Sequence, residues 1–274
     1  MVRGRAFGER LGRLAFAGTV GLALTIILAP LVLVVWLSFF TNEILSLPPE
    51  GYSLRWYGAL VGQRQFVSGF QLSAVVALAA TAAGLLVTLP AAFALSRGDL
   101  PGREAILHGL MSPLVVPALV VGAGLYLALI EFEVDTGLPV TGTVFGFAAG
   151  HVLLTIPWSL RLLTANLAGV DPAIEDAALS LGATPVVTAL KVTLPLIWPG
   201  VVAAALFSFV VSFGNIEVSL FLVQPGQTTL PIAILQYLEW KVDPTVAAVS
   251  ALQIALVAAA LLITDRFVSL AKAV

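Results

Sequence analysis

The stretch LAFAGTVGLALTIILAPLVLVVWLSFF, Leu14–Phe40, is apolar throughout and contains no charged residue. A helix of about 20 apolar residues crosses the hydrocarbon core of a bilayer, so this stretch is long enough to span a membrane. Four arginines precede it, as in a secretory signal peptide, but the apolar part of such a peptide is only about 7–15 residues long. The stretch also ends in Trp36-Leu37-Ser38-Phe39-Phe40 rather than at small residues. It therefore predicts an uncleaved first transmembrane helix.

The composition of the whole chain agrees with membrane residence. Of 274 residues, 59% are hydrophobic and 10% are charged, and the mean hydropathy is +1.05. A soluble domain carries about 25% charged residues, so the extra apolar surface here is expected to meet lipid. The net charge of -2 and the lack of a basic block give no indication of a nucleic-acid partner. The absence of cysteine excludes disulfides, thiolate metal ligands and cysteine nucleophiles.

Apolar stretches of spanning length recur along the chain and predict six transmembrane helices. These predicted spans cover residues 14–40, 66–95, 105–130, 143–166, 194–223 and 244–264. The predicted fold is therefore an all-α integral membrane protein in which residues 1–274 form a single transmembrane domain.

The distribution of basic residues predicts how these spans are oriented. With a cytoplasmic N-terminus, six spans return the C-terminus to the cytoplasm, and ten of the 13 basic residues lie inside. The predicted inner residues are Arg3, Arg5, Arg10, Arg13, Arg97, Arg103, Arg161, Lys191, Arg266 and Lys272, and the outer ones are Arg55, Arg64 and Lys241. Because basic residues concentrate in cytoplasmic loops, this bias predicts that both termini are cytoplasmic.

The longest inner segment, residues 167–193, is more than a linker. Asp171 and Pro172 are typical of a helix N-cap and of the first helical position. Glu175 and Asp176 then fall near the first turn, where the helix dipole favours negative charge. The sequence predicts a short helix that begins at Pro172.

This helix is expected to end near Gly182, and Thr184-Pro185 is expected to start a second one. The mostly small apolar face of the first helix comprises Ala173, Ile174, Ala177, Ala178 and Leu181. Such a two-helix unit is too short for a core of its own. It could lie against the membrane or its own bundle, or it could dock into a groove of another protein.

The spacing of residues in this segment resembles a known family motif. Asp176-Ala177-Ala178 is followed by three residues, Gly182, nine residues, Val192, one residue and Leu194-Pro195. This is similar to the EAA loop of binding-protein-dependent (type I) ABC importer permeases, which reads Glu-Ala-Ala, three residues, Gly, nine residues, Ile, one residue, Leu-Pro. The two differences, Asp176 for Glu and Val192 for Ile, are conservative.

The resemblance implies a cytoplasmic coupling helix held by an ABC ATPase dimer. The residues it assigns to ATPase coupling are Glu175, Asp176, Ala177, Ala178, Gly182, Leu194 and Pro195. No phosphate-binding loop Gly-x-x-x-x-Gly-Lys-Ser/Thr occurs, so we expect no enzyme activity and no cofactor in this chain, with ATP and Mg bound by the ATPase. The resemblance also implies a paralogous second permease subunit, an extracytoplasmic binding protein and a bacterial inner-membrane location.

Further segments resemble the second permease of polyamine-type spermidine/putrescine importers. They are Ser53–Tyr57, Ser112–Pro117, Ser212-Phe213 and Thr229-Leu230-Pro231. The implied substrate is a polyamine-type organic cation. Permeases for phosphonates, opines, ferric iron and thiamine share much of this pattern and remain alternatives. Polyamine permeases often carry acids where this chain has Gly214, Asn215 and Ala118, and this difference weakens the polyamine assignment.

One acidic residue, Glu217, lies within a predicted span. An ionisable group inside a membrane is costly unless it faces water or a partner, so Asn215 and Glu217 are candidates for the substrate path. The alternative is that Glu217 lies at the outer end and is simply hydrated.

Other functions find less support in the sequence. His151 follows Glu131, Glu133 and Asp135, but a lone histidine with loop carboxylates is a weak metal signal, and we predict no metal site. This acidic loop is expected to be solvated or to contact a binding protein. An ion-coupled secondary transporter would need more spans, inverted repeats and buried ion-coupling residues. A membrane scaffold without transport activity would give no reason for the coupling motif.

Overall fold

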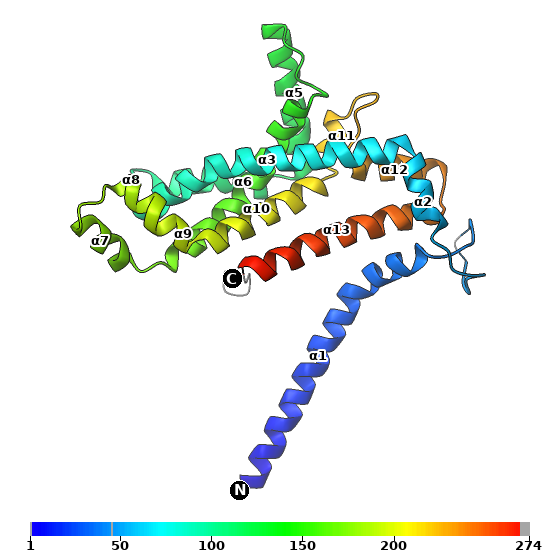
Figure 1. The fold of residues 1–274 in the computed structure, drawn as a ribbon, viewed down its shortest axis with the longest axis horizontal. Coiled ribbons are helices and arrows are strands. Elements are labelled where there is room, and N and C mark those ends of the chain that lie inside the picture. The colour runs from blue at the N-terminus through cyan, green and yellow to red at the C-terminus, as the bar shows by residue number, and fades with distance from the viewer. Residues whose placement is uncertain (1, 45, 269–274) are drawn as a thin grey trace. The chain divides into compact units, whose positions relative to one another are not determined.

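The computed structural model describes the backbone of residues 2–44 and 46–268, and the side chains of this part except those of residues 2–11, 263, 264 and 266–268. This part is helical, with no β-strand among its elements (Figure 1). In chain order the elements are α1 (Val2–Leu37), α2 (Arg55–Gly62), α3 (Arg64–Arg97), α4 (Arg103–Met111), η1 (Ser112–Leu114), α5 (Ala118–Thr136), α6 (Val144–Ala168), α7 (Pro172–Ser180), α8 (Pro185–Thr188), η2 (Ala189–Thr193), α9 (Leu194–Leu196), α10 (Trp198–Phe213), α11 (Ser219–Leu222), α12 (Leu230–Trp240) and α13 (Pro244–Val268). The all-α prediction is confirmed.

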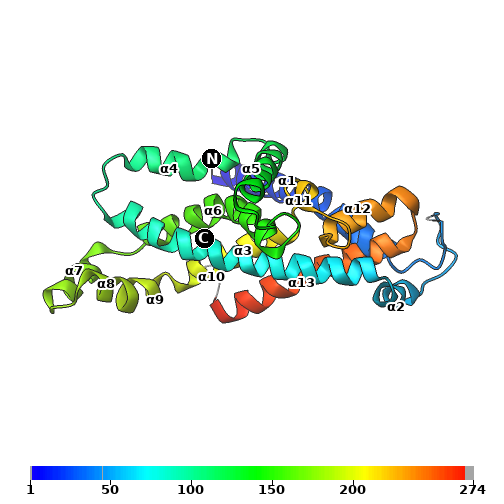
Figure 2. The same cartoon turned by 90° about the horizontal axis from the view of Figure 1, so that it is seen from above.

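The chain divides into two compact units. One unit combines Met1–Gln63 with Tyr237–Leu256, and the other combines Arg64–Gln236 with Val257–Val274. Within the second unit, α3, α6 and α10 pack along one another, as both Figure 1 and Figure 2 show.

Small residues let these three helices approach closely. A Cβ atom on Gly84 of α3 would lie 2.7 Å from the Thr155 hydroxyl of α6, and one on Gly200 of α10 would lie 2.2 Å from the Asn166 side chain. Small residues at helix contacts are typical of membrane proteins, where close backbone approach replaces hydrophobic collapse.

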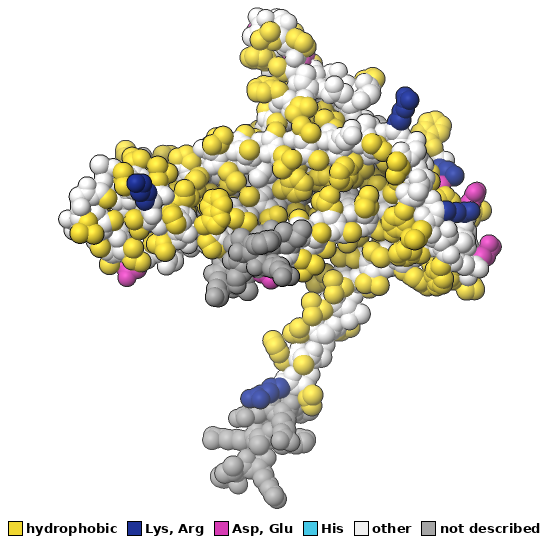
Figure 3. Space-filling view, viewed as in Figure 1, with side chains coloured by type: hydrophobic (Ala, Val, Ile, Leu, Met, Phe, Trp, Pro, Cys, Tyr) yellow, Lys and Arg dark blue, Asp and Glu magenta, His cyan; other side chains and the backbone are white. Residues whose placement is uncertain are grey.

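The apolar side chains of the second unit lie both inside and outside the bundle. One core cluster comprises Ala92, Leu95, Leu160, Leu163, Leu167, Ile197, Val201 and Ala204. Large apolar side chains such as Leu86, which is 78% exposed, face outward, and apolar residues cover much of the face seen in Figure 3. An exposed apolar surface of this extent fits a protein surrounded by lipid.

Four described helices are long and apolar enough to cross a membrane: Gly12–Leu37, Arg64–Arg97, Val144–Ala168 and Pro244–Leu262. Two bent pairs, Arg103–Leu114 with Ala118–Thr136 and Pro185–Leu196 with Trp198–Phe213, raise the number to six if each pair is one span. The six-span topology and its orientation stay predictions. Several basic side chains that predict the orientation, those of Arg3, Arg5, Arg10, Arg266 and Lys272, lie outside the described residues.

Both bends occur next to proline. The first pair is bent by 100°, with Pro117 in an extended conformation at the N-cap of α5. Proline has no amide hydrogen and disfavours a helical residue before it, so the helix cannot continue through Val116. The second pair is bent by 73° at Ile197, just before the Trp198-Pro199 start of α10. The predicted span 194–223 is interrupted once more after Phe213, and a short helix, α11, follows at Ser219.

In the first unit, a buried carboxylate fixes the start of α13. Asp243, only 2% exposed, accepts hydrogen bonds from the Tyr237 hydroxyl, the Thr245 amide and the Lys241 ammonium, each at 2.9 Å. Burial disfavours the charged carboxylate, but the hydrogen bonds outweigh this effect and hold the pKa of Asp243 below its ordinary value. The hydrogen bond and charge of Asp243 in turn raise the pKa of Lys241.

Candidate functional site

The coupling segment folds as a helix, a glycine turn and a second helix. The Asp171 carboxylate accepts a hydrogen bond from the Ala173 amide at 2.9 Å, and Pro172 occupies the first position of α7. The helix ends before Gly182, whose φ of +88° is a left-handed conformation that favours glycine. The Thr184 hydroxyl then caps α8 by accepting from the Val187 amide at 3.3 Å. The capping residues chosen from the sequence therefore perform the local roles expected of them.

Glu175 attaches α7 to the rest of its unit. One of its carboxylate oxygens lies 2.6 Å from Nε of Arg97 at the end of α3, and the other accepts a hydrogen bond from the Thr193 hydroxyl at 2.6 Å. The Glu175 side chain is 13% exposed and that of Arg97 is 27% exposed. Arg97 also donates to the carbonyls of Leu167 and Val170, which precede α7. These contacts hold both ends of the coupling segment against the bundle.

The other predicted coupling residues differ in their surroundings. Asp176 and Ala177 are exposed, Ala178 is half-buried, and Gly182 is exposed in the turn. Glu175 and Asp176 together line a cavity of about 340 Å³ under α7. Further along, Leu194 packs against the core cluster of α3, α6 and α10, whereas Pro195 is exposed. The structure therefore separates an attached side of this segment from an open one.

The open side carries large apolar side chains. Leu181 is 90% exposed, Val186 67% and Leu190 60%, and we call these three residues the docking surface. They belong to the α7–α8 end of the second unit, which projects beyond α6 in Figure 1 and Figure 2. Large exposed apolar side chains on a protruding element are expected at a site of protein contact.

The predicted path residues lie at the break between α10 and α11. The Asn215 side-chain oxygen accepts from the Val218 amide at 3.0 Å and from the Ser219 amide at 3.4 Å, where the short helix begins. The amide nitrogen of Asn215 donates to the Glu217 carboxylate at 2.8 Å, which fixes the direction of that carboxylate. Asn215 therefore connects the helix break to the acidic group.

Asn215 and Glu217 line a cavity of about 410 Å³. Its other lining residues are Pro113, Leu114, Val115, Val116, Pro117, Ala118, Leu154, Trp158 and Val211. The structure thus brings the Ser112–Pro117 segment next to the break after Phe213, although the two are far apart in the chain. Glu217 is exposed, and nine of the 11 residues that line the cavity have apolar side chains.

His151 has a role that the sequence did not indicate. Its ring is 1% exposed and lies between two hydroxyls, 2.7 Å from Ser212 of α10 and 3.1 Å from Ser219 of α11. It therefore bridges the break at which Asn215 lies. The sequence showed only a polar residue in an apolar span, because its partners are far away in the chain.

The acidic residues Glu131, Glu133 and Asp135, which the sequence placed in an outer loop, lie at the C-terminal end of α5 instead, because the helix continues to Thr136. Glu133 accepts hydrogen bonds from the Val140 amide and from both the amide and hydroxyl of Thr141. Over the part of the chain that the structure describes, no group of three or more histidine, aspartate or glutamate side chains could hold a metal ion.

Comparisons with known proteins identify relatives of this chain. It is 30% identical over 232 residues to the putrescine transport system permease protein PotI of Escherichia coli K12, covering 84% of this chain and 82% of the relative. It is 26% identical to the spermidine/putrescine permease PotC of Haemophilus influenzae, over 83% of this chain and 86% of the relative. A permease of Salmonella typhimurium, PhnV, named for 2-aminoethylphosphonate transport, is 29% identical over 94% of this chain and 95% of its own length. No family model matches the chain.

Solved structures share the fold. A subunit of a bacterial ABC transporter for alginate import matches with a TM-score of 0.71 and 16% identity, over 95% of this chain and 97% of that one. A subunit of the MetNI methionine ABC transporter matches with a TM-score of 0.61 and 21% identity, over 74% of this chain and 94% of that one. Together with the relatives, these matches show that the chain belongs to the permease subunits of bacterial ABC importers and is a multi-pass protein of the inner membrane.

Proposed function

We propose that the α7–α8 unit of this permease receives a cytoplasmic ABC ATPase, with the docking surface in the contact. The observation that carries the proposal is the combination of an open apolar side and an attached side on one short element. Asp176 and Ala177, exposed on α7, border the same contact. ATP and Mg are bound by the ATPase dimer in this proposal, since the chain has no phosphate-binding loop.

The attached side allows the element to act as a lever. The Glu175 carboxylate connects α7 to α3 through Arg97 and to the start of the α10 segment through Thr193. A displacement of α7 by closing ATPases is thereby transmitted to the helices that flank the Asn215–Glu217 cavity. A second permease subunit, a paralogue, supplies the other half of the path, and an extracytoplasmic binding protein delivers the substrate.

The substrate in this proposal is a small organic cation of the polyamine type. The Glu217 carboxylate, held by Asn215 in the cavity, supplies a negative charge for an ammonium group. PotI and PotC are named for putrescine and spermidine. The second candidate is 2-aminoethylphosphonate, for which PhnV is named, because it carries an ammonium group as well.

The ATPase contact is tested by Leu181→Asp in the full-length chain produced with its ATPase and partner permease. Burying a leucine contributes about 1.5–3 kcal/mol, so a charge there is expected to weaken ATPase retention at least tenfold. The matched control is Leu138→Asp, which places the same charge at an exposed leucine in the loop between α5 and α6. Retention of the ATPase by Leu181→Asp at the level of the control, measured by co-purification, would contradict the proposal.

A further inference from the structure

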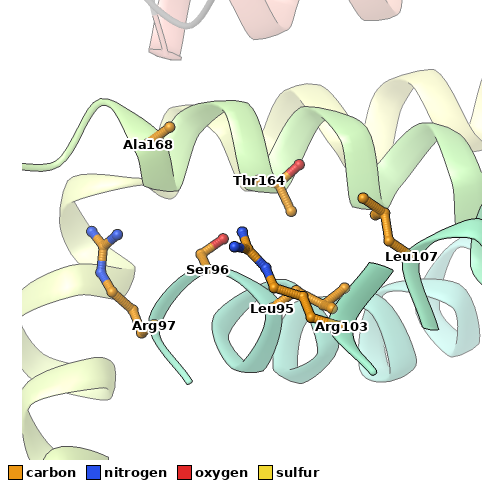
Figure 4. A pocket seen from close by; sticks show the side chains of 7 residues that line it. All are labelled: Leu95, Ser96, Arg97, Arg103, Leu107, Thr164 and Ala168. Carbon is orange, nitrogen blue, oxygen red and sulfur yellow. The ribbon is translucent and has the colours of Figure 1, made fainter. Parts of the chain in front are cut away.

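A third cavity lies at the end of the bundle where α3 ends, α4 begins and α6 ends. It has a volume of about 280 Å³ and is lined by Leu95, Ser96, Arg97, Arg103, Leu107, Thr164 and Ala168 (Figure 4). Two of these seven residues are arginines and none is acidic. Apart from Arg97, which pairs with Glu175, none of its lining residues takes part in the proposed coupling contact or in the substrate path.

The two arginines are in different states. Arg97 forms an ion pair with Glu175, which lies outside this cavity. The Arg103 guanidinium extends over the cavity toward Thr164 and Ser96 in Figure 4, and among the described residues it has no hydrogen-bond or ion-pair partner. The nearest acid in sequence, Glu104, is 79% exposed and faces His108 instead. Arg103 is exposed, so its guanidinium presents one positive charge at the mouth of the cavity without a protein partner among the described residues.

The walls indicate which chemistry would compensate this charge. A guanidinium presents parallel N–H donors that match the oxygens of a phosphate group. The half-buried Ser96 hydroxyl has no partner among the described side chains and supplies a further donor beside it. Leu95, Leu107 and Ala168 form an apolar part of the wall that suits the glycerol and upper acyl carbons of a lipid, whereas the Thr164 hydroxyl donates to the Leu160 carbonyl.

We propose that this cavity binds the phosphate headgroup of an anionic lipid from the cytoplasmic leaflet, with Arg103 as its main donor. This step rests on the proposed orientation, which places Arg97 and Arg103 on the cytoplasmic side, and not on the substrate. The cytoplasmic leaflet is rich in anionic lipids, and basic pockets between membrane helices on that side are suited to their headgroups. A soluble phosphate shares this chemistry, so the experiment has to separate the two sources.

The test measures lipid binding to the purified full-length chain by native mass spectrometry. Dioleoyl phosphatidylglycerol is compared with dioleoyl phosphatidylcholine, which has the same acyl chains and no net charge. One basic residue at a membrane surface contributes about fivefold in affinity. We therefore expect a preference of about fivefold for phosphatidylglycerol, which Arg103→Gln abolishes.

Arg161→Gln is the matched control, since Arg161 is exposed on α6, lies near Thr164 and does not line the cavity. It should keep the preference, and an equal loss in both variants would overturn the proposal in favour of diffuse surface charge. If inorganic phosphate binds in an Arg103-dependent way and no preference among lipids is seen, the ligand is a soluble phosphate and the proposal of a lipid headgroup is wrong.

A measurement on the unmodified chain tests the site without relying on correctly folded variants. A photoactivatable phosphatidylglycerol should crosslink to peptides that contain Ser96 or Arg103, and crosslinks confined to other regions would contradict the site. Both measurements read lipid binding directly. Their failure would leave the ATPase contact and the transport function unaffected.

Discussion

Glu175 and Asp176 are neighbours in the chain but have opposite surroundings. Glu175 turns inward to Arg97 and Thr193, whereas Asp176 is exposed. The motif aligns Asp176 with the acidic residue of the family pattern, and the sequence alone grouped both residues as coupling residues. The partner of Glu175 could not be predicted, because Arg97 is 78 residues away and no local pattern points to it. Local capping was predictable, since the donors and acceptors lie within a few residues.

At the substrate path, Glu217→Gln is expected to impair uptake of putrescine by cells that contain the complete importer. The change removes the negative charge while keeping the shape of the side chain and its contact with Asn215. Loss of one ion pair with the bound cation is expected to raise the apparent KM about tenfold, or about 1.4 kcal/mol. Glu131→Gln serves as the control, because Glu131 is exposed on α5 and does not line the cavity. Unchanged uptake kinetics in Glu217→Gln would argue strongly against a role in the path.

The Asp243 cluster predicts an acid dependence of stability. Its folded-state pKa is lowered, so the ionised carboxylate stabilises the fold above its unfolded pKa of about 3.9 and this contribution is lost as the pH falls through the folded value. Asp243→Asn removes the charge and is expected to flatten the loss of thermal stability as the pH falls from about 5 through the folded-state pKa. Thermal unfolding in detergent measures this, with exposed Glu239→Gln as the control. Equal acid sensitivity in Asp243→Asn and the unmodified chain would refute the assignment.

At the scale of the elements, the turn after α7 depends on the backbone of Gly182. Its φ is +88°, and a Cβ atom there would meet nothing within 4 Å. Gly182→Ala therefore costs only backbone strain, about 1–2 kcal/mol. We expect amide hydrogen exchange in α7 and α8 to accelerate about five- to thirtyfold, as this free energy implies. Ser180→Ala, two residues earlier at the last position of α7, should leave exchange nearly unchanged, and equal rates in the two variants would disprove the strain argument.

The sequence predicted the helices better than their breaks. α3, α6 and α13 occupy the positions of predicted spans because long apolar runs leave few alternatives in lipid. The 100° bend at Pro117 and the interruption after Phe213 were not predicted, although proline and glycine stand at these places. Proline is tolerated inside membrane helices, so only packing decides whether it kinks a helix or ends it. The cavity lined by Asn215 and Glu217 depends on both breaks. The sequence indicated the two segments that form it, but not that they lie together.

At the scale of the whole molecule, the absence of cysteine makes the proposed orientation directly testable. Ser46→Cys lies in the first predicted outer loop and Ser180→Cys lies at the end of α7, and both positions are exposed. A membrane-impermeant maleimide added to intact cells is expected to label the first variant and not the second. The second should react only after permeabilisation, and the reverse pattern would invert the topology.

The contact between Glu175 and Thr193 depends on the number of residues between them. The π-helical turn η2 (Ala189–Thr193) ends at the residue whose hydroxyl meets the Glu175 carboxylate. Each residue of a helix turns the chain by about 100° and advances it by about 1.5 Å. One residue more or less between Gly182 and Leu194 would therefore move Thr193 away from Glu175 and rotate α9 and α10 relative to α7. The number of residues between Gly182 and the Leu194-Pro195 pair therefore sets the rotation of the helix that begins at Leu194 relative to α7.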